Sequence, residues 1–234
     1  MNRSRDKVRC ALNHQNAGSI PVDFGSTAVT GIHCRIVEAL RNYYGLAPRP
    51  VKIVDAFQML GEIDAELAEK IGVDCIGIGG PKDIFDLDTT RMHEQTTPWG
   101  QRVLVPEAMD LTPDMRGDIY VYAGGDQNYP PSAVMPKGCY FINAIERQQP
   151  IEEDRLDPED NVEEFGLLTE NDLAYYCAEA DKAYQTGRAV VASFGGTALG
   201  DVAFVPGMGL KQPKGIRSVV DVYCYAAGLF ASGI

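Results

Sequence analysis

Two segments of the chain share one pattern, in which an amphipathic helix is followed by a short apolar strand that ends in paired glycines. The first reads "GEIDAELAEKIG" and then "VDCIGIGG", and the second reads "TENDLAYYCAEADKAYQTG" and then "RAVVASFGG". A strand that is apolar on both faces is typical of a parallel sheet, in which both faces are covered. Helices that alternate with such strands predict an α/β fold, either a barrel or a doubly wound sheet.

A third unit precedes these two. The stretch "SIPVDFG" at 19–25 predicts a brief strand, and "GIHCRIVEALRNYYGL" at 31–46 has apolar residues at helical spacing and stops at Gly45, which suits a left-handed cap. Residues 4–16 predict a short opening helix. Thr169 and Asp172 have the spacing of a capping box at the start of the last helix.

Residues 91–150 have a different pattern. They contain "TPWGQRVLV", "GDIYVYAGGD" and "KGCYFINAI", which are alternating or aromatic runs separated by Gly and Pro. Such runs predict a β meander. The expected organisation is therefore a single incomplete barrel domain over 1–234, with about three strand–helix units and a β-rich insertion at 91–150.

The glycine-rich loop within 189–209 resembles a phosphate-binding loop but does not fit either template. The dinucleotide fingerprint fails because Thr197 stands at the position of its second glycine. The nucleotide-triphosphate loop fails because Asp201 replaces the lysine and Val202 replaces the hydroxyl residue. An aspartate there repels phosphate. The loop is better explained as a strand-to-helix connection at the mouth of a sheet or barrel.

Composition excludes several classes of function. The 234 residues carry a formal net charge of -12, so the chain has no basic surplus with which to bind nucleic acid nonspecifically. The six cysteines include no C-x-x-C pair and no zinc-type spacing, which is typical of reduced thiols. No apolar run has the length of a membrane span, and no secretory leader follows the charged start. We expect a cytoplasmic protein.

The order of five segments resembles the first part of the uroporphyrinogen decarboxylase superfamily, specifically its methyltransferase-like branch. These segments are "DKVRCALNHQ", "IPVDFG", "GEIDAELAEKIGVDCIGIG", "TPWG" and "ASFGGTALGDVAFVPGMGLKQPKGIR". The resemblance implies a (β/α)8 barrel with its active site at the carboxyl ends of the strands. It also implies corrinoid-linked methyl transfer, in which a zinc ion held by histidine and cysteine activates a thiol. Those zinc ligands come from later strands, which are expected beyond Ile234.

Two departures from the superfamily bear on the expected function. Porphyrinogen decarboxylases carry an arginine-rich segment on the first strand, whereas 21–31 of this chain contains no arginine to hold a polycarboxylate. About three strand–helix units are also fewer than the eight that close a barrel. The chain is therefore expected to be an N-terminal portion that is inactive by itself. His14, His33 and His93 each stand alone, without a cysteine at zinc-ligand spacing.

The expected site residues follow the predicted strands. Asp23 and Asp201 are the candidate catalytic carboxylates, with helix capping or a turn as the alternative role of each. The candidate substrate-binding residues are Phe24, Ser26, Thr27, Gly79, Gly80, Gly195, Gly196 and Thr197. The glycines leave room for a large planar ligand against the backbone, or else they serve tight turns that need positive φ. No metal ligand is predicted within the chain.

Three functions remain open at this point. The first is methyl transfer that involves a zinc-activated thiol or a cobalt centre, with zinc and corrinoid as cofactors of the complete protein. The second is decarboxylation of a tetrapyrrole, in which Asp23 polarises a pyrrole NH. The third is a non-catalytic fragment that needs a partner to cover its open sheet edge. The allowed partners are a small-molecule or corrinoid-type substrate, a corrinoid protein and a second copy of the chain.

Overall fold

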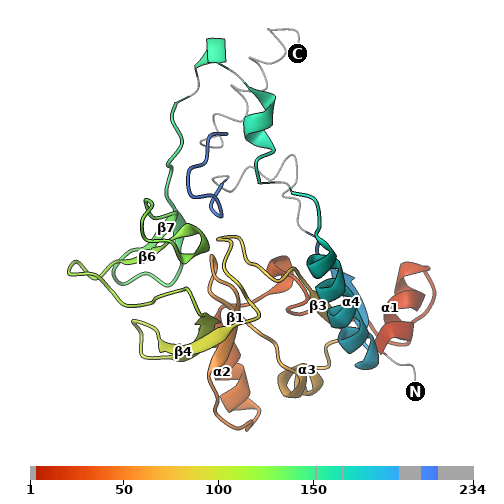
Figure 1. Ribbon diagram of the computed structural model, residues 1–234. Helices are drawn as coiled ribbons and strands as arrows, with labels where there is room; N and C mark the ends of the chain where they lie inside the picture. The colour runs from red at the N-terminus through yellow and green to blue at the C-terminus, as the bar shows by residue number, and fades with distance from the viewer. Residues whose placement is uncertain (1–3, 151, 156, 165, 195–206, 216–234) are drawn as a thin grey trace. The chain divides into compact units, whose positions relative to one another are not determined.

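The computed structural model describes residues 4–150, 152–155, 157–164, 166–194 and 207–215. The fold is mixed α/β, as the helix–strand pattern predicts (Figure 1). The contacts within the chain divide it into two compact units. The first unit comprises Met1–Pro81, Glu94–Val105 and Leu168–Gly195, and the second comprises Lys82–His93, Pro106–Leu167 and Gly196–Ile234. None of the sheets formed by the described residues closes into a barrel.

A four-stranded sheet forms one part of the first unit. Its strands are β1 (Val51–Asp55), β2 (Leu60–Gly61), β4 (Met92–Thr96) and β5 (Arg102–Pro106), in the order β2-β1-β5-β4. β1 pairs antiparallel with β2 and parallel with β5. Helix α2 (Cys34–Tyr43) packs against β1 and β2. The contact is apolar, because Val37 of α2 and Val51, Ile53 and Val103 of the sheet are at most 4% exposed.

Helix α2 lies within the predicted 31–46, and Gly45 adopts a positive φ of 67°, as a left-handed cap requires. Helix α3 (Ala65–Ile71) begins at Asp64, whose side chain accepts hydrogen bonds from the backbone of Glu66 and Leu67. It ends at Gly72 in the left-handed conformation. Both helices therefore end where the glycines of the sequence predict.

A parallel strand pair forms the other part of the first unit. β3 (Cys75–Ile78) pairs in parallel with β9 (Ala189–Ala192), with Cys75 opposite Ala189. Helix α1 (Ser4–Leu12) and helix α4 (Glu170–Gln185) pack against this pair (Figure 1). The capping box of Thr169 and Asp172 is present at the start of α4. The two strands and their parallel direction confirm the prediction from the repeated pattern.

The predicted burial of β3 on both faces is wrong. All four residues of β3 are partly exposed, and β9 alternates between partly exposed and exposed positions. Val190, for example, is 36% exposed. The reason is that α1 and α4 cover the pair only partly, so apolar composition alone does not report how many neighbours a strand has.

The predicted strand at 19–25 is also wrong as regular structure. This segment is extended but has no strand ladder, because Pro21 lacks an N–H donor and Gly25 turns the chain with a φ of 85°. It nevertheless lies beside β3. The Asp74 N–H donates to the Val22 carbonyl at 2.7 Å, and further along, the Ser26 carbonyl lies against Gly77. The segment therefore runs in the same direction as β3.

The second unit contains a small antiparallel sheet. Its strands β6 (Ile119–Val121), β7 (Ala133–Met135) and β8 (Asn143–Ala144) follow one another in both sequence and space. This part confirms the meander predicted within 91–150, whereas β4 and β5 join the four-stranded sheet instead. The largest fully buried side chains of the unit are Phe85, Leu87, Leu111, Ile119, Met135 and Ile142.

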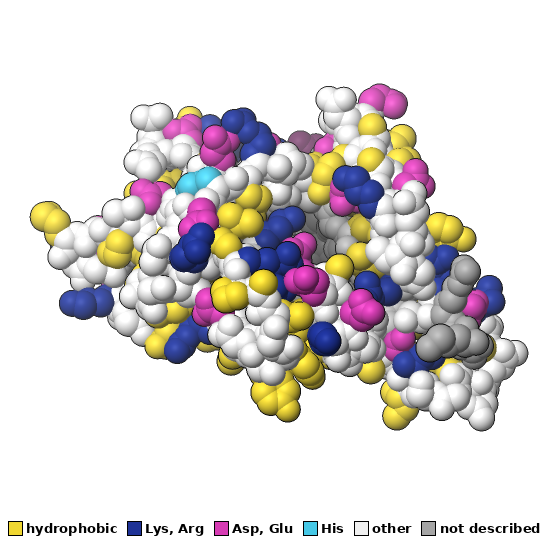
Figure 2. Space-filling view, turned by 90° about the horizontal axis from the view of Figure 1, so that it is seen from below, with side chains coloured by type: hydrophobic (Ala, Val, Ile, Leu, Met, Phe, Trp, Pro, Cys, Tyr) yellow, Lys and Arg dark blue, Asp and Glu magenta, His cyan; other side chains and the backbone are white. Residues whose placement is uncertain are grey.

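Short 3-10 helices complete the described structure. They are η1 (Ala28–Thr30), η2 (Ala123–Gly125), η3 (Glu153–Arg155) and η4 (Pro158–Asn161). On the face shown in Figure 2, basic and acidic side chains are interspersed and do not form a field of one sign. No helix among the described residues is long and apolar enough to cross a membrane.

The close approach of Ser26 to Gly77 gives a direct test of the fold. A Cβ added at Gly77 meets the Ser26 carbonyl oxygen at 1.7 Å, whereas a Cβ at Gly79 meets no atom within 4 Å. We expect Gly77→Ala to lower the free energy of unfolding by roughly 3 kcal/mol, because backbone must move to relieve the clash. Gly79→Ala, the control, should change it by less than about 0.5 kcal/mol. Urea unfolding followed by the fluorescence of Trp99 measures both free energies. Equal effects would show that the Ser26 carbonyl does not lie against Gly77.

A buried ion pair holds α1 to the start of β3. Lys7 Nζ lies 2.5 Å from Asp74 Oδ2, and the side chains are 16% and 6% exposed. Burial raises the pKa of Asp74, but hydrogen bonds from Lys7, the Val22 N–H and Ser4 outweigh it, so the pKa lies below its usual value. The resulting stabilisation is present above the unfolded pKa of about 3.9 and is lost as the pH falls through the lower folded pKa.

Removal of Lys7 should be costly because it leaves Asp74 charged in a buried position. We expect Lys7→Met to destabilise the chain by about 3 kcal/mol at pH 7. The control is Lys182→Met, which breaks the exposed pair of Lys182 and Glu179 and should cost less than about 1 kcal/mol. Both values come from urea unfolding. A Lys7→Met effect no larger than that of the control would show that α1 is not held by this pair.

Candidate functional site

The candidate site lies beside the parallel pair of β3 and β9, where the segment 22–27 turns away from β3. The Ser26 hydroxyl donates a hydrogen bond to Asp23 Oδ2 at 2.7 Å. Asp23 is exposed, and Ser26 is partly buried. The structure therefore brings together two of the predicted residues, with the hydroxyl holding the carboxylate in place. Val22 lies beside Asp74 at the start of β3, and Ser26 lies beside Gly77 further along it, so the segment runs toward the carboxyl end of β3, the end at which ligands of parallel sheets bind.

Cys75 is the third member of this cluster, and the sequence analysis missed it. Burial raises the pKa of the Cys75 thiol, and the negative charges of Asp23 and Asp74 raise it further. Burial and the two carboxylates therefore favour the protonated thiol, the opposite of the environment that activates a nucleophilic cysteine. The sequence gives no signal for this contact, because it depends on the alignment of 22–26 with β3.

Thr27 and Phe24 are the other predicted residues of this loop. Thr27 stands at the N-cap position of η1, and its backbone N–H donates to Thr30 Oγ1 at 3.4 Å. The geometry therefore gives Thr27 a structural role as a helix cap. Phe24 is partly buried. Neither residue adds a polar group to the cluster of Asp23, Ser26 and Cys75 that the structure describes.

A backbone hydrogen bond joins the carboxyl ends of β3 and β9, and an aromatic contact joins the residues after β9 to α4. The Ser193 N–H donates to the Ile78 carbonyl at 2.9 Å, and the Tyr176 hydroxyl of α4 donates to the Ser193 carbonyl at 3.3 Å. Phe194 packs on Tyr176 with ring centroids 4.9 Å apart and is itself 63% exposed. This aromatic pair was missed because its two residues come from different elements. It gives the edge an apolar surface.

The glycines at the end of β3 are open to solvent. Gly79 is exposed and Gly80 partly exposed, and neither has a positive φ. The alternative that these two glycines serve turns with positive φ is therefore wrong. The remaining predicted residues, Gly195, Gly196, Thr197 and Asp201, lie outside the described residues.

In the part of the chain that the structure describes, no group of three or more His, Cys, Asp or Glu side chains is arranged so that it could hold a metal ion. His33 instead caps α2, because its Nδ1 accepts a hydrogen bond from the Arg35 N–H at 3.2 Å. The ring also lies 5.6 Å from that of Trp99, whose Nε1 donates to Gln101 at 3.0 Å. His33 and Trp99 thus have the structural roles of cap and anchor.

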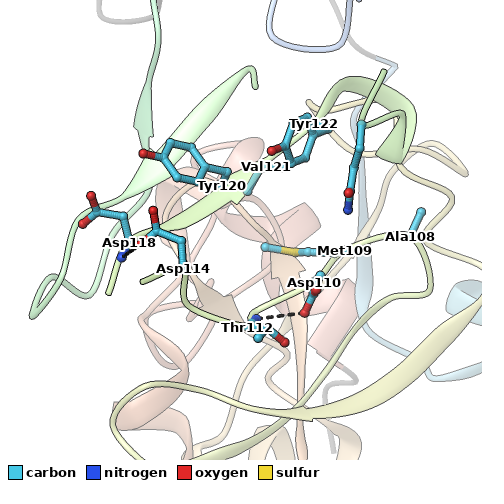
Figure 3. A pocket seen from close by; sticks show the side chains of 10 residues that line it. Ala108, Met109, Asp110, Thr112, Asp114, Asp118, Tyr120, Val121 and Tyr122 are labelled. Atoms are coloured by element: carbon cyan, nitrogen blue, oxygen red, sulfur yellow. Dashed lines mark hydrogen bonds between the residues drawn. The ribbon is translucent and has the colours of Figure 1, made fainter. Parts of the chain in front are cut away.

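The second unit has a cavity of its own, of about 160 Å³ (Figure 3). The rings of Tyr120 and Tyr122 lie on one side of it, and Asp110 lies on the other. The lining aspartates shape the loops: Asp110 accepts from the Thr112 N–H, and Asp114 accepts from the Asp118 N–H. The backbone bond from Asp118 is the main cause that lowers the pKa of Asp114. These carboxylates are explained by turn formation.

Comparisons with known proteins found no match: no family model, no curated protein and no solved structure matches this chain. The order of the sequence motifs and the geometry of the site are therefore the evidence for the class of the protein. That geometry consists of a parallel strand pair, an adjacent Asp23–Ser26 pair, a protonated thiol and an apolar edge.

The environment of Cys75 predicts how fast it reacts. We expect Cys75 to be alkylated by iodoacetamide more slowly at pH 7.5 than the exposed Cys139 and Cys177, because its pKa is raised. Asp23→Asn removes one of the two negative charges and should speed the alkylation of Cys75 severalfold. The rates are read peptide by peptide with mass spectrometry.

The control for that experiment is Asp88→Asn. Asp88 is likewise an exposed aspartate that accepts a hydrogen bond from a nearby hydroxyl, that of Thr90 at 2.6 Å, but it belongs to the second unit. It should leave the rate at Cys75 unchanged. If Asp23→Asn and Asp88→Asn have the same effect, the placement of Asp23 beside Cys75 is wrong.

Proposed function

We propose that the chain belongs to the methyltransferase-like branch of the uroporphyrinogen decarboxylase superfamily and forms one wall of its substrate site. The order of the five sequence segments supports this proposal. So does the arrangement of β3 and β9, which are parallel, adjacent and each preceded by a helix. Such units are the building blocks of a (β/α)8 barrel, whose ligands bind at the carboxyl ends of the strands.

The observation that carries the proposal is the Asp23–Ser26 pair beside β3. Ser26 holds an exposed carboxylate by a bond of 2.7 Å, so Asp23 can accept a hydrogen bond or a proton from a bound substrate without first being ordered. At the carboxyl end of β9, Phe194 and Tyr176 form an apolar surface that could contact the body of an organic ligand. Asp23 acts as the acceptor, and Ser26 acts as the positioning residue.

The described residues do not fit zinc, one of the two cofactors that the superfamily implies. They contain no group of side chains that could hold zinc. The cavities of about 160 and 200 Å³ are smaller than the roughly 300–1,000 Å³ of ordinary ligand pockets and cannot enclose a corrinoid, so a corrinoid could contact the described residues only on the open surface that carries Asp23. We therefore derive no step through zinc or cobalt, and we assign to this chain only the orientation of the substrate.

Decarboxylation of a tetrapyrrole is the second candidate, and the same carboxylate favours it. An exposed Asp23 can accept hydrogen bonds from pyrrole N–H groups. The segment 21–31 supplies no arginine to hold the carboxylates of such a substrate, which makes this candidate the weaker one. The two candidates differ in the ligand that the chain should bind.

Ligand titration tests the proposal. We expect the full chain to change the visible absorbance of hydroxocobalamin saturably, because the peripheral amides of a corrinoid can donate to Asp23. Asp23→Asn should weaken binding about tenfold, and the control Asp88→Asn should not. Saturable quenching of uroporphyrin fluorescence without cobalamin binding would favour decarboxylation instead. If neither ligand binds, both enzymatic proposals fail and a non-catalytic role is supported.

A further inference from the structure

The cavity of the second unit combines aromatic rings with side chains that can form hydrogen bonds (Figure 3). Its volume is about 160 Å³. Half of the residues that line it are exposed, so it is an open depression and not an enclosed pocket. These exposed residues are Ala108, Asp110, Thr112, Asp114 and Gln127. The cavity lies within the second unit and shares no residue with the Asp23–Ser26 pair.

Tyr120 and Tyr122 give the cavity an aromatic wall. In β6, Ile119 and Val121 are buried whereas Tyr120 is partly exposed, because successive side chains of a strand point to opposite faces. Tyr122 is also extended, with a φ of -116° and a ψ of 140°, so its ring lies on the same face as that of Tyr120. Figure 3 shows both rings on one side of the cavity. They offer an apolar surface to a ligand.

Two aspartates at the cavity each have a carboxylate oxygen available. Asp110 Oδ1 accepts a hydrogen bond from the Thr112 N–H at 2.8 Å, and Asp118 Oδ1 accepts one from the Lys137 N–H at 2.8 Å. The other oxygen of each, Oδ2, accepts no hydrogen bond from the part of the chain that the structure describes. Turn formation therefore accounts for one oxygen of each carboxylate and leaves two strong acceptors at the cavity.

The charges around the cavity do not favour a charged ligand. The hydrogen bond from the Asp118 N–H lowers the pKa of Asp114, and the positive charge of Arg116 lowers it further. The stem of Lys137 lies over Gly117, since a Cβ added there meets Lys137 Cδ at 2.8 Å. Two cationic side chains thus lie beside three carboxylates. A ligand cation gains little from this arrangement, and a ligand anion meets the carboxylates of the lining, so a neutral ligand that donates hydrogen bonds fits best.

We propose that this cavity binds a neutral saccharide unit. Hydroxyl groups of a pyranose ring donate to the Oδ2 atoms of Asp110 and Asp118, and the C–H face of the ring lies against the aromatic wall of Tyr120 and Tyr122. A closed cavity of about 150 Å³ holds a molecule of the size of benzene. The open depression therefore takes one edge of a sugar ring, and the rest of the ring stays in solvent.

Saturation-transfer NMR of the full chain with methyl β-glucoside tests this site. All the ring substituents of this sugar are equatorial, so both ring faces present C–H groups to an aromatic side chain. We expect saturable binding that Tyr120→Ser weakens about tenfold, whereas Tyr120→Phe retains it because the ring remains. The control is Tyr43→Ser, at a tyrosine of α2 that is 81% exposed, and it should bind the sugar as the unchanged chain does.

The carboxylate is tested by a separate variant. Asp110→Asn keeps an oxygen for the Thr112 N–H but removes the charge, so we expect binding of methyl β-glucoside to be about fivefold weaker. Asp88→Asn is the matched control. Asp88 accepts the Thr90 N–H at 2.8 Å in the same kind of turn, but it does not line the cavity.

Comparison ligands decide whether the assignment stands. Sorbitol has hydroxyl groups but no ring face, and tetramethylammonium has a charge but no hydroxyl group, so both should bind more weakly than methyl β-glucoside. Asp110→Asn provides a second variant in case Tyr120→Ser does not fold, as judged by circular dichroism. Absence of glucoside binding, equal binding by Tyr120→Ser, or tighter binding of tetramethylammonium would each overturn the proposal. Hydroxocobalamin binding is unaffected by these outcomes, so the two proposals fail separately.

Discussion

The first unit depends on the close contact of the extended segment 22–26 with β3. Two features make this contact possible: the missing side chain of Gly77, which admits the Ser26 carbonyl, and the buried carboxylate of Asp74, which accepts the Val22 N–H and the Lys7 ammonium. The Asp74 backbone N–H in turn donates to Val22. Asp74 thus links α1, the extended segment and β3. The positions of Asp23 and Cys75 follow from that link, so the candidate site inherits its geometry from residues outside it.

Local patterns predicted much of the fold. The repeated helix–strand pattern located α3, β3, α4 and β9, and the capping box of Thr169 and Asp172 marked the start of α4. The predicted meander corresponds to β6, β7 and β8. β1 was not anticipated, although its alternating buried and less buried residues have the period of a strand. Its parallel partner β5 lies about fifty residues away, and pairing over such a distance leaves no local signal.

The candidate site was predictable only where it is local in sequence. Asp23 and Ser26 are three residues apart and were predicted together. Cys75 reaches them only because 22–26 aligns with β3, and Tyr176 meets Phe194 only because α4 packs on β9. The wrong prediction of a strand at 19–25 also arises from contacts with residues that are distant in the sequence. An apolar run was interpreted as a strand, but Pro21 and Gly25 direct its hydrogen bonds to Asp74 instead of to a ladder.

Charged side chains are arranged differently at two places in the first unit, the edge of β3 and the amino end of β1. At the edge of β3, burial and the negative charges of Asp23 and Asp74 raise the pKa of the Cys75 thiol. The positively charged Lys7 is already paired with Asp74. An exposed carboxylate there is suited to a ligand that donates hydrogen bonds. At the amino end of β1, the carboxylate of Asp64 is bound by Arg41 and Arg49. Asp64 is thus neutralised within the fold, whereas the exposed Asp23 is held by the Ser26 hydroxyl and can accept a further hydrogen bond from a ligand.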